Sequence, residues 1–211
     1  MASARPTVPA VSDRPAHRPS TREAMLDAAE AHLGEGGTLT LDSAARAAGV
    51  TKPGLMYHFS TKEQLLGAIL DRMSARYERE LLAQVADRFP GAVDDLASAP
   101  AEQRHLAYLE WACRAELSAA DLVIFADPHL RVTLTERWQE QVETWLHVPA
   151  VAGPVRRARL LAVRLMADGL WFDRAAGLLD EVGAEAERLR SLAADLLEEP
   201  AAAAPPGEVV R

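Results

Sequence analysis

The 211 residues of this chain are enough for one or two domains with a substantial core, and 49% of them are hydrophobic. Cys113 is the only cysteine, which excludes an internal disulfide and fits a reducing compartment. No apolar run approaches the ~18 residues of a membrane span, and the N-terminus lacks the hydrophobic core of a signal peptide. We therefore expect a soluble, cytoplasmic protein with no membrane partner.

The net charge of −8 argues at first against binding to nucleic acid, but the charges are unevenly distributed. Residues 1–66 contain 7 Lys or Arg and 7 Asp or Glu, so this part is neutral, and the acidic excess lies in the remaining 145 residues. DNA binding by the first third would therefore depend on a few well-placed cations and on helix N-termini, not on bulk charge.

The composition, rich in Ala and Leu with 5% aromatic residues, favours an all-α protein. Residues 1–19 lack apolar periodicity and are rich in Pro and Arg, so we predict a disordered arm that is either a solvated tail or an extra contact to DNA. Residues 199–211 are likewise expected to be a disordered tail. The first helix is predicted to begin at Ser20, with Glu23 completing a capping box, and to end at the glycines that start at Gly34.

Two short helices are predicted next, separated by a tight turn. Thr40 is the expected cap of the first, Gly49 suits the left-handed turn, and Thr51 is the expected cap of the second. Ser60 and Glu63 form a second capping-box pattern, which is typical of the start of a longer helix. Apolar periodicity predicts that this helix runs to about residue 88 and that four further helices cover residues 101–118, 129–147, 155–179 and 184–198.

The segment from about Ser20 to Leu70 resembles the DNA-binding domain of TetR-family transcriptional regulators. The resemblance rests on DSAARAAGV, TKPG, LMYHF and STKEQLL, which occur in the family's order and spacing and span about the first third of the chain. It implies an N-terminal three-helix helix-turn-helix domain at residues 20–66. It also implies a C-terminal helical domain for ligand binding and dimerisation at residues 67–198.

Residues at the start of a helix in the major groove face the base edges. Lys52 can donate to guanine or phosphate, Gly54 permits close approach, and Tyr57 offers a hydroxyl and a ring. The resemblance places Tyr57 and His58 at the DNA surface and Lys62 on a phosphate. The predicted DNA-binding residues are Thr40, Thr51, Lys52, Pro53, Gly54, Tyr57, His58 and Lys62.

Each of these assignments has a structural alternative. Tyr57 could pack beneath the first helix, His58 could be a capping or core residue, and Lys62 could simply be solvated. Lysine has the wrong charge for a helix N-terminus, however, so Lys62 favours an external anion such as phosphate. Met56 and Phe59 are expected to be core residues.

The large aromatic residues beyond residue 110 suggest either a ligand pocket or an ordinary core. Asp168 lies in an apolar helix face, where it could bind a cationic ligand or form an ion pair with Arg164. His105, His129, His147 and Cys113 do not have the spacing of metal ligands, so no metal site is predicted. The predicted ligand-binding residues are Trp111, Phe125, Trp138, Trp145, Met166, Asp168 and Trp171.

The resemblance and these features together predict a homodimeric repressor that binds an inverted-repeat operator in double-stranded DNA and is released by a small, largely apolar effector. An activator is the alternative, because the direction of regulation depends on the position of the operator. The dimer would be formed by the last two helices, whose repeated leucines are Leu161, Leu165, Leu189, Leu192 and Leu196. A helical enzyme is the alternative from another class, but no catalytic motif supports it and no cofactor is expected. A helical interaction protein that has lost DNA binding is the third interpretation.

Overall fold

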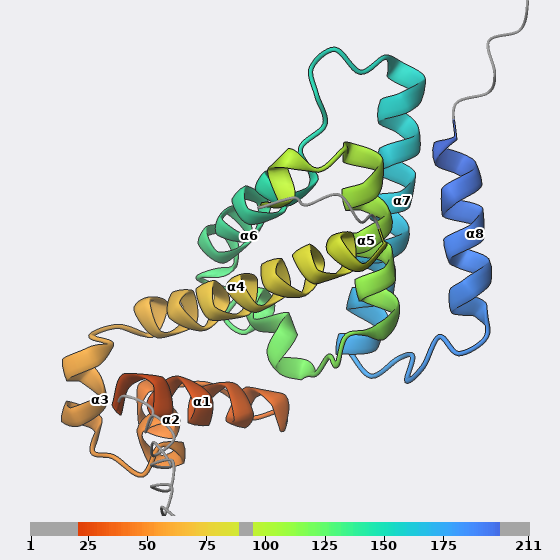
Figure 1. The fold of residues 1–211 in the computed structure, drawn as a ribbon. Helices are drawn as coiled ribbons and strands as arrows, with labels where there is room; N and C mark the ends of the chain where they lie inside the picture. The colour runs from red at the N-terminus through yellow and green to blue at the C-terminus, as the bar shows by residue number, and fades with distance from the viewer. Residues whose placement is uncertain (1–20, 89–94, 199–211) are drawn as a thin grey trace, which may run out of the picture.

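The computed structural model describes residues 21–88 and 95–198, and every regular element within these ranges is a helix (Figure 1). The all-α prediction is therefore confirmed. The predicted arm at residues 1–19, the tail at residues 199–211 and the cap at Ser20 lie outside the described residues. No helix in the described part of the chain is both long and apolar enough to cross a membrane.

Three helices form the N-terminal unit: α1 (Thr21–Gly34), α2 (Leu41–Ala47) and α3 (Lys52–His58). They enclose a small core in which Leu26, Leu55 and Phe59 are each at most 1% exposed. Phe59 is thus a core residue, as predicted, because Leu55 and Phe59 are four residues apart and share the inner face of α3.

The long helix α4 (Lys62–Arg88) runs from the N-terminal unit into the C-terminal part of the molecule (Figure 1). The helix extends to Arg88, the last described residue before residue 95, so its predicted end at about residue 88 stays a prediction, whereas its start differs from the prediction. Thr61 is the capping residue and accepts a hydrogen bond from the Gln64 amide at 3.1 Å, while the Gln64 side chain accepts one from the Ser60 amide at 2.9 Å. The predicted Ser60–Glu63 capping box is therefore wrong by one residue, and the proposed boundary at residue 66 lies inside a continuous helix.

The C-terminal part packs around α4. In Figure 1, α5 crosses the end of α4 and lies along α7, while α8 flanks them on the outer side. Neither of the two 3₁₀ segments is among the predicted helices, and the helix predicted over residues 101–118 ends at Arg114. The elements are η1 (Leu96–Ser98), α5 (Ala101–Arg114), η2 (Ala119–Phe125), α6 (Arg131–Leu146), α7 (Pro154–Ala175) and α8 (Glu185–Leu197).

The segment η2 joins the two parts of the molecule. Ser118 and Asp121 form its capping box, and Asp121 is only 3% exposed. A buried carboxylate needs compensating donors, and here Arg76 and Tyr77 of α4 both donate to it. Because α1 also packs on η2, the position of η2 links the N-terminal unit to the C-terminal helices.

Candidate DNA interface and aromatic core

The orientation of α3 is set by local hydrogen bonds. Thr40 accepts from the Ser43 amide at 3.0 Å, and the Ser43 hydroxyl accepts in return from the Thr40 amide at 2.9 Å. Gly49 has a φ of 65°, so the chain turns through a conformation that glycine adopts without strain. Thr51 then caps α3 by accepting from the Gly54 amide at 3.2 Å. The predicted caps and turn are confirmed.

The structure favours glycine at position 54 for a reason other than the predicted close approach to DNA. A Cβ atom built on it would lie 3.2 Å from the Thr51 hydroxyl oxygen, so a larger residue would press on the cap. Pro53 occupies the first turn of α3, where its missing amide hydrogen costs nothing, and it is exposed. Both residues therefore stabilise the start of α3.

Tyr57 is 87% exposed, which excludes the alternative that it packs beneath α1. His58 is partly exposed and meets the Tyr57 ring edge-on, with 5.1 Å between ring centroids. Met56 is 40% exposed, so the prediction that it belongs to the core is wrong. Leu55 and Phe59 already fill the inner face, and a residue next to Leu55 points about 100° away around the helix.

Both predicted lysine contacts are paired with carboxylates in the DNA-free chain. The Lys52 ammonium lies 2.9 Å from Asp42, and both side chains are largely exposed. Lys62 lies 2.6 Å from Asp127, and this pair is more shielded, with side-chain exposures of 27% and 16%. Arg46 in the last turn of α2 is exposed and has no ion-pair partner among the described residues, although it is not one of the predicted DNA-binding residues.

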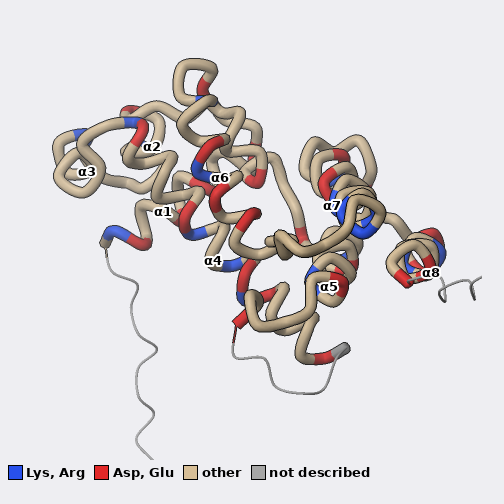
Figure 2. The backbone as a smooth tube through the Cα atoms, turned by 90° about the horizontal axis from the view of Figure 1, so that it is seen from above, with Lys and Arg blue, Asp and Glu red and all other residues tan. Residues whose placement is uncertain are grey.

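The N-terminal unit is tied to α4 and η2 by a network of ion pairs. Arg72 binds Asp27 and Glu30 of α1, and Arg76 bridges Glu30 at 2.7 Å and Asp121 at 3.1 Å. Burial raises the pKa of Glu30, but the hydrogen bonds from Arg76 and Arg72 outweigh this effect and lower it. Figure 2 shows the resulting mixture of positive and negative residues along α4, whereas α3 carries few charges.

The four tryptophans come together in one buried aromatic cluster. Trp138 stacks on Trp171 with centroids 5.7 Å apart and meets Trp145 edge-on at 5.7 Å. Tyr77 of α4, which was not predicted, joins Trp138 to Trp111. Burial, followed by the nearby Asp121 charge, raises the pKa of Tyr77 well above its usual value.

Of the remaining predicted ligand residues, Asp168 is linked to this cluster through Tyr108, which stacks on Trp111 with 5.6 Å between ring centroids. Phe125 is 48% exposed and pairs with Phe172, while Met166 is partly buried against the core. Asp168 accepts a hydrogen bond from the Tyr108 hydroxyl at 2.8 Å and lies 3.4 Å from Arg164. This geometry favours the ion-pair alternative for Asp168 over a cation-binding role.

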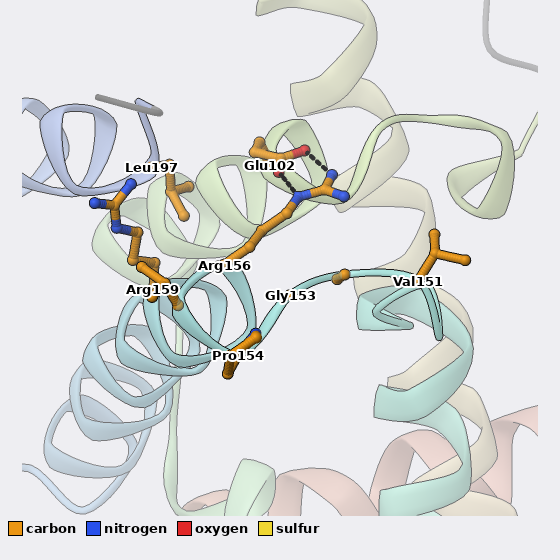
Figure 3. A pocket seen from close by; sticks show the side chains of 9 residues that line it. Glu102, Val151, Gly153, Pro154, Arg156, Arg159 and Leu197 are labelled. Carbon is orange, nitrogen blue, oxygen red and sulfur yellow. Dashed lines mark hydrogen bonds and ion pairs between the residues drawn. The ribbon is translucent and has the colours of Figure 1, made fainter. Parts of the chain in front are cut away.

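Two cavities bear on the ligand prediction. One of about 470 Å³ lies between α1, α4, α5 and η2, and it includes Trp111 but none of the other predicted ligand residues. The other, of about 480 Å³, lies near the start of α7, where Arg156 forms a bidentate ion pair with Glu102 (Figure 3). Within residues 21–88 and 95–198, no group of three His, Cys, Asp or Glu side chains is placed to hold a metal ion.

Comparisons with known proteins show which family model and which solved structures this chain is similar to. Residues 25–69 match the family model of bacterial regulatory proteins of the tetR family. The multidrug binding protein EbrR complexed with imidazole is 24% identical, with a TM-score of 0.56 over 88% of this chain and 99% of EbrR. EbrR complexed with malachite green is 22% identical, with a TM-score of 0.57 over 86% of this chain and 100% of EbrR.

A third solved structure is NalD, the secondary repressor of the MexAB-OprM multidrug efflux pump in Pseudomonas aeruginosa. It is 22% identical, with a TM-score of 0.53 over 83% of this chain and 94% of NalD. No curated protein matches the sequence. The solved structures share the fold, and the family model matches α1–α3 and the start of α4. Residues 25–69 are therefore similar to the N-terminal domain of bacterial regulatory proteins of the tetR family, and the chain shares its overall fold with these solved structures.

Proposed function

We propose that the protein is a homodimeric repressor that binds an inverted-repeat operator and is released by a small, largely apolar effector. In this proposal residues 20–66 form the DNA-binding domain and residues 67–198 form the effector-binding and dimerisation domain. The observation that carries the DNA-binding role is the outer face of α3. Its start is fixed by the Thr51 cap, and it presents Lys52 and the 87% exposed Tyr57 to solvent.

The contacts divide into two kinds. Lys52 and Tyr57 on α3 would contact base edges, because they lie on the exposed face of the helix that enters the major groove. The capping residues Thr40 and Thr51 and the lysine at the start of α4, Lys62, would contact phosphates, as would Arg46. Pro53, Gly54 and His58 would support α3 at close range to the DNA.

The dimer is supported by an exposed apolar face on the last two helices. Leu161, Leu165 and Leu192 are 52%, 59% and 59% exposed, and the exposed Phe172 shares one face of α7 with Leu161 and Leu165 because of its helical spacing. Exposed leucines at this density are typical of a surface that another subunit covers. Pairing α7 and α8 with those of a second copy would form a four-helix interface, with the same patch on both subunits.

The effector is proposed to bind at the aromatic cluster around Trp138. NalD is described as a repressor, and EbrR as a multidrug binding protein that takes malachite green, an aromatic cation. Trp145 is 1% exposed and its indole nitrogen has no hydrogen-bond partner within the part of the chain that the structure describes, so a polar group of an effector could satisfy it. Release of DNA requires that the effector bind the DNA-incompetent conformation more tightly.

A gel shift with DNA from upstream of the protein's own gene, repeated at increasing salt, tests the DNA-binding role. We expect binding that weakens steeply with salt because phosphate contacts release counterions. Malachite green should quench the tryptophan fluorescence and release the DNA. Quenching without any change in DNA affinity would contradict the switch.

A further inference from the structure

The first residue of α4 is held by the C-terminal part of the molecule. The Lys62 ammonium donates to Asp127 Oδ2 at 2.6 Å across 65 residues of sequence. Asp127 lies between η2 and α6, and this ion pair is partly shielded from solvent. Salt and water therefore weaken it less than they weaken the exposed pair between Lys52 and Asp42.

The Asp127 carboxylate is fixed on its own side as well. Its Oδ1 atom accepts from the His129 amide at 2.8 Å, which leaves Oδ2 for Lys62. The hydrogen bond from Lys62, together with that from the His129 amide, lowers the pKa of Asp127, so the carboxylate is charged at neutral pH. Its position follows η2, which Arg76 and Tyr77 hold against α4 through Asp121.

This geometry conflicts with an unhindered phosphate contact by Lys62. An ammonium can donate three hydrogen bonds, so it can bind a carboxylate and a phosphate together. The negative charge of Asp127 would, however, offset the lysine and repel a phosphate brought to the same place. The pair between Lys52 and Asp42 is largely exposed and opens more easily, so Lys62 is the more strongly hindered of the two lysines.

We propose that Asp127 is a built-in competitor of the DNA phosphate for Lys62 and lowers the affinity for DNA. This inference rests on the proposed DNA-binding function and assigns a regulatory residue to the same site. Because Asp127 lies two residues beyond the end of η2, a displacement of η2 would alter how much of the Lys62 charge is available to DNA. The pair thereby connects the C-terminal part to phosphate binding without any change in α3.

The test measures binding of the full chain to a fluorescein-labelled 40-base-pair duplex of arbitrary sequence by fluorescence anisotropy at several salt concentrations. Asp127→Asn keeps an oxygen that can accept from the His129 amide but removes the charge. We expect it to bind about twofold to fivefold more tightly than the wild type, the range of a partly exposed ion pair. The salt dependence should become steeper by up to about one unit of slope.

Asp71→Asn is the matched control. It also removes one negative charge from an ion pair between α4 and the C-terminal part, because Asp71 binds Arg137, but it releases no lysine at the predicted DNA surface. It should leave the affinity within about the error of the wild-type value. Asp127→Ser, which also retains an acceptor oxygen, repeats the test should the asparagine variant lose its helical circular dichroism.

Lys62→Ala separates competition from a general charge effect. It should weaken binding more in the Asp127→Asn background than in the wild type. Equal or weaker binding by Asp127→Asn, or tightening that persists when Lys62 is alanine, would overturn the inference. In either case salt-dependent binding by the wild type would leave the proposed function intact, whereas failure of every variant to bind the duplex would contradict both.

Discussion

Leu165→Arg should break the proposed dimer. Leu165 is 59% exposed in the single chain. Complete burial of a leucine stabilises by about 1.5–3 kcal/mol, so covering its exposed part gives about 1–2 kcal/mol. A twofold axis repeats this contact, which makes the loss about 2–4 kcal/mol per dimer. The dissociation constant should therefore rise by at least about 30-fold, and the unpaired guanidinium adds to this effect.

Sedimentation equilibrium at low micromolar concentration measures this change. Val132→Arg is the matched control, because Val132 is also largely exposed, at 64%, but lies on α6 outside the proposed interface. The control should dimerise like the wild type, and circular dichroism should show that both variants keep their helices. If Leu165→Arg dimerises as tightly as Val132→Arg, the α7–α8 interface is refuted. A wild-type monomer at these concentrations would refute the dimer itself.

Three further variants test the DNA-binding unit and the core. Lys52→Ala should change the base preference of the protein by about 1–3 kcal/mol at the base pair that Lys52 contacts. Competition between duplexes measures this change, and an unchanged preference would contradict direct contact between Lys52 and a base. Leu55→Ala should lower the free energy of unfolding by about 2–5 kcal/mol in urea titrations, because Leu55 is 0% exposed. A loss below about 1 kcal/mol, as expected for a substitution at an exposed position, would contradict the placement of Leu55 in the core. Burial lowers the pKa of His105 to about 4, whereas the unfolded chain titrates near 6.5, so stability should fall by up to about 3 kcal/mol as the pH drops from about 6.5 to about 4. His105→Gln should abolish that part of the pH dependence, and an unchanged slope would disprove the assignment.

The local features of the N-terminal unit could be predicted because short-range sequence determines them. Thr40 and Thr51 each bond an amide three residues away, and Gly49 alone accounts for the positive φ of the turn. The predicted cap of α4 is wrong because two neighbouring residues can each cap a helix. Ser60 and Thr61 are both good caps, and only the position of Gln64 decides between them.

The rest of the candidate site depends on contacts between distant residues. The Lys62–Asp127 pair spans 65 residues, and Tyr77 meets Asp121 across 44. Neither spacing follows a helical period, so the sequence alone gives no signal for them. The clustering of tryptophans was foreseeable from their concentration beyond residue 110, but the choice between Arg164 and a ligand for Asp168 required the fold.

The central claim is that α3 reads a specific operator on DNA. Genomic fragments bound by the purified full-length protein at low salt, once selected and sequenced, test it most directly. The account predicts one enriched inverted repeat, whose half-sites lie about one helical turn or a multiple of it apart, as a twofold dimer requires. The enrichment should disappear when Lys52 and Tyr57 are both replaced by alanine. Recovery of no enriched motif, or of the same motif with the doubly substituted protein, would contradict the claim.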